Sequence, residues 1–451
     1  MSGLPGGWAE VEIGEIAEVV AGGTPKANDA SNFEAPGVGI AWLTPADLSG
    51  YKAKEISKGS RDLSLKGYES CSAKLMPKGS LLFSSRAPIG YVALAANDIS
   101  TNQGFKSFIF PREINPSFAY YYLKSIRELA DSLGTGTTFK ELSGTTAKTL
   151  PFRMAPTSEQ TRIAQKLDEL LAQVDTLKAR IDAIPVLLKR FRQSVLAAAV
   201  SGRLTEEWRT QHSQPVWELS TFGDAGAVSG GLTKNAKRSE LSLEKPYLRV
   251  ANVHANKLIL DDVTSIGLTE KEFEKTKLRA GDILIVEGNG SLEHIGRAAI
   301  WGGEVPDCSH QNHLIRWRAT SKVLPNFALY QLLSPQGRKQ LVELANSTTG
   351  LHTLSITKVA ALSLPVPTPG EQAEIVRRVE QLFAFADQLE SKVASAKTRI
   401  DHLTQSILAK AFRGELVPQD PNDEPASALL ERIRAQRAAA PKTKRTRKTS
   451  A

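Results

Sequence analysis

The chain has 451 residues, a length that predicts two to four domains rather than one core. Hydrophobic residues make up 41% and charged residues 23% of it, which excludes wholesale disorder. No apolar run approaches the ~20 residues that span a bilayer, and the N-terminus lacks the pattern of a secretory signal. The only cysteines, Cys71 and Cys308, exclude a disulfide framework and an all-cysteine zinc site. We therefore expect a cytoplasmic protein that does not enter a membrane.

The net charge of +9 favours a polyanionic partner. Residues 419–451 alone hold eight Lys or Arg and four Asp or Glu side chains, so nearly half of the excess lies there. Basic tails of this kind are mostly disordered and solvated, and we expect the same of residues 419–451. Charge by itself is therefore a weak argument for nucleic acid.

Residues 1–150 predict a mixed α/β region, which we call the first head. An apolar run at 79–83, which begins at a glycine, predicts a strand. Residues 115–129 predict a helix that begins at Pro116, because proline is favoured at the first helical position.

Residues 151–208 predict a long central spacer helix. Apolar side chains recur at alternating spacings of three and four residues, a period that specifies a coiled-coil seam. The expected seam residues are Leu167, Leu170, Val174, Leu177, Ile181, Ile184 and Leu188. Gly202 is the expected helix stop, and Pro185 is expected to kink or break the helix locally.

Residues 209–362 predict a second head, with strands at 283–287 and 314–317 and a helix at 324–344. Residues 363–418 predict a C-terminal spacer helix that stops at Gly414. The seam residues expected in this helix are Val379, Leu382, Leu389, Val393, Ile400 and Leu403.

The two halves of the chain repeat each other. Residues 159–204 align with residues 371–416 without a gap and share 14 of 46 positions, and a looser match extends upstream from Trp8 and Trp217. The long helices could belong to two unrelated bundles, but each seam needs a partner and the other copy is the obvious one. The sequence therefore predicts an α+β fold: two α/β heads joined by two long antiparallel coiled-coil helices, with a pseudo-two-fold internal repeat.

The sequence contains no convincing active site. A phosphate-binding GxxxxGK[ST] loop is absent, and residues 288–290 are better interpreted as a turn than as part of a dinucleotide fingerprint. Residues 115–118 resemble the NPP[FY] pocket of adenine methyltransferases only superficially and are better interpreted as a helix cap. Several possible zinc ligands gather in the second head: His294, His310, His313, His352 and Cys308. They lack the disciplined spacing of a zinc site, so we expect no metal.

Nucleic-acid readers need cations for phosphates and amide, hydroxyl or guanidinium groups for base edges. Polar segments punctuated by glycine supply such groups in both heads. The candidates in the first head are Ser85, Arg86, Asn102, Gln103, Lys106, Thr137 and Lys140. The candidates in the second head are Asn289, Ser291, His310, Gln311, His313, Thr349 and His352. Any one segment could be an ordinary solvated loop, but different polar side chains at related positions suit two heads that read different sequences.

The order and duplication of these features resemble the specificity subunit of type I restriction–modification systems, over the chain to about residue 435. Four kinds of paired feature carry the resemblance: Trp8 and Trp217, the Leu-Pro steps at 150–151 and 364–365, the Glu-Gln pairs at 159–160 and 371–372, and the segments that begin at Gly202 and Gly414.

This resemblance implies that residues 1–150 and 209–362 are target-recognition domains, each reading one half of a bipartite, asymmetric site in double-stranded DNA. The helices are expected to act as spacers and to dock two methyltransferase (modification) subunits, which restriction (nuclease–translocase) subunits would join. The chain itself is expected to be non-catalytic and to bind no cofactor, because S-adenosylmethionine, ATP and Mg²⁺ would bind the partner subunits.

Two other hypotheses stay open at this point. An enzyme that acts on DNA by itself would bind S-adenosylmethionine or Mg²⁺ as the isolated chain. A coiled-coil adaptor between protein partners would tolerate charge reversal at Arg86 or Lys106, whereas a DNA reader would lose binding.

Overall fold

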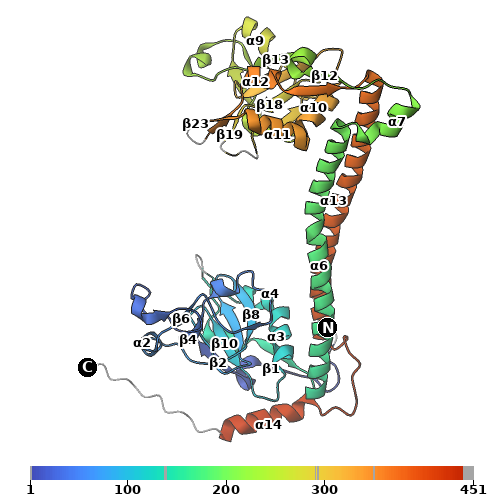
Figure 1. Ribbon diagram of the computed structural model, residues 1–451. Coiled ribbons are helices and arrows are strands. Elements are labelled where there is room, and N and C mark those ends of the chain that lie inside the picture. The colour runs from blue at the N-terminus through green and yellow to red at the C-terminus, as the bar shows by residue number, and fades with distance from the viewer. Residues whose placement is uncertain (1–2, 137–139, 290, 292–293, 349–350, 440–451) are drawn as a thin grey trace. The chain divides into compact units, whose positions relative to one another are not determined.

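The computed structural model describes residues 3–136, 140–289, 291, 294–348 and 351–439. It divides into two compact units, residues 1–181 with 396–451 and residues 182–395. Each unit holds one head and part of both long helices (Figure 1).

The described residues of the first head form three sheets, with strand orders β2-β10-β7-β8-β5, β3-β6-β4-β9 and β1-β11. The strands are β1 Ala9–Glu12, β2 Glu18–Ala21, β3 Phe33–Glu34, β4 Ile40–Leu43, β5 Glu55–Ile56, β6 Arg61–Leu63, β7 Leu81–Ser85, β8 Ile89–Ala95, β9 Ser100–Thr101, β10 Lys106–Ile109 and β11 Pro151–Met154. The helices are α1 Ile13–Ile16, α2 Leu65–Glu69, α3 Pro116–Ser125, α4 Arg127–Ser132 and α5 Gly144–Lys148, with 3-10 turns η1 Ala30–Asn32 and η2 Pro45–Leu48.

The second head has sheets β13-β22-β18-β20, β17-β14-β21, β12-β25, β15-β16 and β19-β24-β23. The strands are β12 Glu218–Thr221, β13 Gly226–Gly230, β14 Glu244–Leu248, β15 Val253–His254, β16 Lys257–Leu258, β17 Thr264–Gly267, β18 Ile283–Val286, β19 Gly288–Asn289, β20 Ala298–Ile300, β21 Ser309–His310, β22 Leu314–Ala319, β23 Asn346–Thr348, β24 Leu351–Thr353 and β25 Ser363–Val366. The helices are α8 Phe222–Ala225, α9 Glu270–Thr276, α10 Pro325–Leu333, α11 Pro335–Leu344 and α12 Ile356–Ala360, with 3-10 turns η4 Ala236–Glu240 and η5 Val250–Asn252.

Each predicted strand of the heads is present, and each predicted head helix is divided in two. Every residue of β7 and of β18 is buried, as expected for inner strands. The helix predicted at 324–344 ends before Ser334, because Pro335 lacks the N–H that would continue it and instead begins α11, with Ser334 as its cap.

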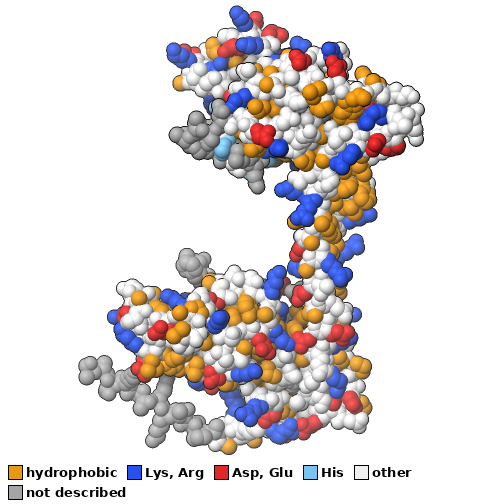
Figure 2. Space-filling view, in the orientation of Figure 1, with side chains coloured by type: hydrophobic (Ala, Val, Ile, Leu, Met, Phe, Trp, Pro, Cys, Tyr) orange, Lys and Arg blue, Asp and Glu red, His pale blue; other side chains and the backbone are white. Residues whose placement is uncertain are grey.

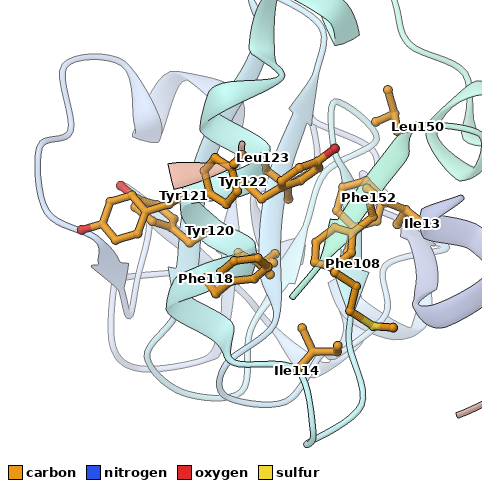
Figure 3. Packing of buried hydrophobic residues seen from close by; sticks show 14 of the residues in the cluster. Ile13, Phe108, Ile114, Phe118, Tyr120, Tyr121, Tyr122, Leu123, Leu150 and Phe152 are labelled. Atoms are coloured by element: carbon orange, nitrogen blue, oxygen red, sulfur yellow. The ribbon is translucent and has the colours of Figure 1, made fainter. Parts of the chain in front are cut away.

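Aromatic side chains fill the core of the first head (Figure 3). Phe118 and Tyr122 of α3 meet Phe152 of β11 edge to face, with ring centroids 6.1 and 4.8 Å apart. Tyr120 and Tyr121 point away from this cluster, and Tyr121 donates its hydroxyl to Asp168 of the first long helix. The core therefore faces the sheet on one side of α3 and the long helix on the other.

The two long helices are α6 (Thr157–Val200) and α13 (Pro369–Ala411), and they pack side by side and antiparallel (Figure 1). Lys178 pairs with Asp401 in one unit and Arg192 with Glu390 in the other. Pro185 lies inside α6, which continues through it, so the predicted break is wrong: a long helix held along its side by α13 tolerates the lost hydrogen bond.

The predicted helix stops are confirmed, and the predicted head boundaries at 150 and 362 are too early. Gly202 and Gly414 have φ of +76° and +74°, a left-handed conformation that favours glycine. Strand β11 pairs with β1, and β25 pairs with β12, so both strands complete the heads rather than begin the spacers.

Most predicted seam residues are buried or half-buried between the helices, but Leu177 and Leu403 are exposed. The flanking apolar positions Val174, Ile181, Ile400 and Ile407 stay buried or half-buried, so the exposure is local to Leu177 and Leu403. Val186, Leu187 and Phe385, outside the predicted seam, are also exposed, and Figure 2 shows hydrophobic side chains along the helix pair.

A tryptophan, a glutamate and a glutamine fasten each head to its long helix. Trp8 Nε1 donates to Glu159 Oε2 at 3.0 Å, and Trp217 Nε1 donates to Glu371 Oε2 at 2.9 Å. The neighbouring glutamines accept backbone N–H groups of the heads: Gln160 from Asn115 at 2.9 Å and Gln372 from Leu324 at 2.7 Å. The repeated Trp and Glu-Gln positions are therefore structural contacts.

The prediction of a disordered tail is wrong for residues 419–439. Helix α14 (Ala426–Ala439) buries Leu429, Leu430 and Ile433 in the core of the first unit. Ala426 N donates to Gly7 O at 2.7 Å, and Arg434 pairs with Glu15 of α1 at 2.5 Å. The apolar side chains of this basic segment therefore pack as one face of a helix against the first unit. The predicted disorder of residues 440–451 lies outside the described residues.

A 3-10 turn, η3 Arg203–Thr205, and a short helix, α7 Glu206–Gln211, connect α6 to the second head. No helix among the residues that the structure describes is long and apolar enough to cross a membrane.

Candidate nucleic-acid interface

Three predicted DNA-reading segments of the first head meet at the end of β7. Ser85 N donates to Gly104 O and Leu142 N donates to Ser85 O, both at 2.8 Å. Thr135 and Glu141 exchange backbone hydrogen bonds of 3.0 and 2.9 Å. The loops around residues 86, 103 and 140 therefore form one continuous surface, although they lie far apart in the sequence.

Cations gather on this surface around the carboxylate of Glu141. Lys106 Nζ lies 3.2 Å and Arg86 Nη1 lies 3.8 Å from it. Lys140 pairs with Asp131 at 2.7 Å. A cavity of about 530 Å³ opens here, lined by residues 86–89, Asp131, Lys140 and Glu141. Because the ion pairs are partly exposed, phosphate or base groups can compete for Arg86 and Lys140 at small cost.

Asn102 and Gln103 lie in the turn between β9 and β10. Asn102 Oδ1 accepts the N–H of Gly104 at 2.8 Å, which holds the turn, and the exposed Gln103 contacts Thr24. Thr137, the remaining candidate of this head, lies outside the described residues.

In the second head the corresponding segments meet at Glu287, which takes the place of Ser85. Glu287 N donates to His313 O at 2.9 Å and Leu354 N donates to Glu287 O at 2.7 Å. Strand β19 pairs with β24, which sets Asn289 opposite His352. The structure therefore brings residues 287–289, 313 and 352 together.

His313 and Glu287 form the polar pair of this surface, with Nδ1 3.3 Å from Oε2. Gln311 Oε1 accepts the N–H of Val250 at 3.3 Å, and Ser291 is half-buried. His352 is half-buried as well, and Thr349 lies outside the described residues.

The prediction that His310 contacts DNA is wrong. The sequence match sets His310 opposite Asn102, but strand pairing sets it opposite Thr101: Tyr247 and Leu248 pair with Ser309 and His310 as Trp42 and Leu43 pair with Ser100 and Thr101. One residue of register moves a strand side chain to the other face.

The His310 ring is completely buried, with Nδ1 3.1 Å from Thr276 O. Burial, reinforced by Arg316, lowers the pKa of His310 to about 3, so the ring stays neutral.

Ser85 is also completely buried, so the prediction of direct contact is wrong for its side chain as well. Its role is the backbone connection of the three loops. Lys106 is nearly buried, with Nζ 3.5 Å from Ser85 Oγ and from Gln103 O.

Sequence reasoning missed Glu141, which organises the cations of the first head. A search for basic, amide and hydroxyl groups passes over an acid, and its position directly after Lys140 was the available signal. Among the described residues, no three His, Cys, Asp or Glu side chains are grouped so that they could hold a metal ion.

Comparison with known proteins agrees with this architecture. Residues 5–186 and 216–396 match the family described as the type I restriction modification DNA specificity domain. The chain is 34% identical to the type I restriction enzyme EcoKI specificity subunit of Escherichia coli K12, with 99% of each chain covered. It is 35% identical to the StySPI specificity subunit of Salmonella potsdam, over 99% of this chain and 98% of that one.

Solved structures share the fold. A chain from a structure of a type I R-M system matches with a TM-score of 0.63 at 17% identity, covering 92% of this chain and 100% of that one. The HsdS subunit from Thermoanaerobacter tengcongensis matches with a TM-score of 0.58 at 18% identity, covering 92% and 98%. The duplicated head and helix and these full-length relatives agree: the chain belongs to the family of type I restriction–modification specificity proteins.

Proposed function

We propose that this chain is the DNA specificity subunit of a type I restriction–modification complex and that it reads a bipartite, asymmetric site. The observation that carries the proposal is the pair of heads with one framework and different polar surfaces. The loop junction holds Arg86, Lys106 and Glu141 in the first head, and Glu287 and His313 in the second. Two different surfaces on one framework suit two different half-sites.

Within the first head, Arg86 and Lys140 are the proposed contacts to guanine edges or phosphates, and Gln103 is the proposed contact to adenine. Within the second head, the groups proposed for base edges are Asn289, Gln311, His313 and His352, because these residues lie on or beside the loop junction.

Catalysis belongs, in this proposal, to partner subunits. The chain is expected to bind DNA without turning it over, while modification subunits use S-adenosylmethionine and restriction subunits use ATP and Mg²⁺. Exposed apolar side chains on the long helices, such as Leu187 and Phe385, support the helices as a docking surface for the modification subunits.

A genome-wide map of DNA methylation in the source cells, with and without this gene, tests the proposal. Loss of methylation at one bipartite, asymmetric motif is the expected result and gives both half-sites and their spacing. An unchanged map in cells that contain an active modification subunit would contradict the proposal.

The purified chain allows a sharper test at Arg86. We expect Arg86→Ala to weaken binding to that motif by about 1–3 kcal/mol, with relaxed preference at one base pair of one half-site. Arg432→Ala, which removes the same charge from the exposed surface of α14, is the control. Equal weakening on every sequence would assign Arg86 to a phosphate, and no change would favour a protein adaptor.

A further inference from the structure

The contact between head and long helix differs between the two halves beyond the shared Trp–Glu bond. In the first half, Lys54 bridges the head to α6: its Nζ lies 2.7 and 2.9 Å from the carboxylate oxygens of Asp168 and 3.1 Å from Ser117 Oγ. The ammonium also lies 5.6 Å from the centroid of the Tyr121 ring. A carboxylate, a polar side chain and an aromatic face thus form a receptor for one ammonium.

The second half repeats the three residues that surround Lys54. Glu380 repeats Asp168 at the offset of 212, while Asn326 and Tyr330 repeat Ser117 and Tyr121 at the offset of 209. Asn326 Nδ2 donates to Glu380 Oε1 at 3.0 Å. Among the described residues, no lysine or arginine makes an ion pair with Glu380.

The space beside Glu380 is an open groove of about 840 Å³ between α10, α13 and the end of α6. Leu196, Leu329, Leu333 and Phe383 form its apolar wall. Leu333 stands where the first half has Lys124, whose ammonium lies 3.5 Å from the hydroxyl of Tyr120. The groove is thus apolar where the first half is basic, and it is large enough for several side chains.

The charges around the groove select for a cation. Asp387 and Glu390 also line it, and both are paired with Arg192. Among the described carboxylates that line the groove, Glu380 is the one without an ion pair. A ligand that combines apolar side chains with one ammonium or guanidinium group complements both the wall and the carboxylate.

We propose that this groove binds an amphipathic segment of a protein partner, in which one lysine takes on Glu380, Asn326 and Tyr330 the place that Lys54 takes in the first half. The inference rests on the proposed function in one respect: that function identifies the protein partner as a modification subunit. Lys257 of the short β15–β16 hairpin also lines the groove. A single lysine side chain on Glu380 would still leave the apolar wall uncovered.

Titration of the full-length chain with the purified modification subunit of the same system, followed by calorimetry, tests this inference. We expect Glu380→Lys to weaken binding of a modification subunit at least 10-fold, because the new ammonium repels the incoming cation and fills the groove. Leu333→Lys, which introduces the residue of the first half, should weaken it as well. Glu274→Lys makes the same charge change on the exposed face of α9 in the same head and should leave the affinity unchanged.

A zero-length carbodiimide cross-link on the wild-type complex gives a second measurement that needs no variant. Glu380 should link to a lysine of the modification subunit. A link from Glu380 to Lys257 in the complex, or unchanged affinity in both groove variants, would overturn the inference and leave the proposed function standing. Failure of the wild-type chain to bind any modification subunit would overturn both.

Discussion

Glu159 and Glu371 occupy equivalent positions in the two halves, but the charged groups around them differ. Both are buried and accept a tryptophan N–H. Glu371 also accepts Thr205 Oγ1 at 2.8 Å and pairs with Arg209 at 2.9 Å. Glu159 has no such cation bonded to it, and its Oε1 has no hydrogen-bond partner among the described residues.

The contacts between head and long helix differ in the same way, but here the additional cation lies in the first half. Here Asp168 of the first half pairs with Lys54, whereas Glu380 of the second half accepts a bond from Asn326 and has no ion pair among the described residues. The duplicated framework therefore fixes where carboxylates and rings stand, while single basic residues decide whether each site is closed or left for another molecule. Four experiments test this difference between the halves, and they follow in order of decreasing expected effect.

The matched core phenylalanines test whether each unit is stable by itself. Phe118 and Phe327 occupy equivalent positions and are completely buried. We expect Phe118→Ala and Phe327→Ala each to cost about 3–5 kcal/mol, because each leaves a cavity in one core. Hydrogen exchange should show the loss of protection in the mutated unit. Equal loss in both units would mean that the two cores unfold together.

Helix α14 packs into the core of the first unit and should stabilise that unit. Leu429→Ala is expected to cost about 2–4 kcal/mol, because its side chain is 1% exposed in the core of the first unit. Urea denaturation followed by fluorescence measures the cost, and Leu177→Ala, at an exposed helix position, is the control that should change little. An equal effect of both variants would contradict the observed packing of α14.

Charge removal at the two buried glutamates should have different outcomes. Glu371→Gln is expected to cost about 1–3 kcal/mol, because Arg209 loses its carboxylate. Glu159→Gln keeps an acceptor for Trp8 and removes a buried charge, so its free energy of unfolding at pH 8 should be at least that of the wild type.

The pH dependence of this difference has a definite sign. Burial raises the pKa of Glu159 above its ordinary value of 4.5, although the Trp8 bond opposes the shift. The folded state therefore binds a proton on Glu159 more tightly than the unfolded state does. The carboxyl group contributes stability below pH 4.5, and this contribution is lost as the pH rises through the pKa of the folded state. Urea denaturation at several pH values should show that Glu159→Gln gains relative to wild type as the pH increases. The opposite slope would mean that a cation compensates Glu159.

Removal of the first junction's lysine should have the smallest effect. Lys54→Ala is expected to cost about 0.5–1 kcal/mol, because the Lys54 and Asp168 side chains are 25% and 45% exposed and water screens the pair. Hydrogen exchange in α3 should increase. Lys257→Ala in the second half should change neither stability nor exchange, and a matching loss there would show that Lys257 occupies the groove.

Most of the architecture could be predicted from the sequence. The gapless repeat, the heptad spacing and the paired Trp and Glu-Gln positions predict two heads and two long helices, because each depends on local periodicity or on a contact that duplication repeats. The same reasoning failed where a local rule competed with packing: α13 supports α6 through Pro185, and the core of the first unit orders α14.

Which polar residues are available for binding could not be predicted from the sequence, because it depends on how distant segments pack. Strand register makes His310 equivalent to Thr101, whereas the gapless sequence match sets it opposite Asn102. This difference of one residue places the His310 side chain on the buried face of the strand. The Glu141 cation cluster and the receptor around Glu380 depend on side chains that meet across long sequence separations. Periodicity is a property of neighbouring residues and can be read along the chain, whereas exposure and charge pairing arise only when distant segments pack.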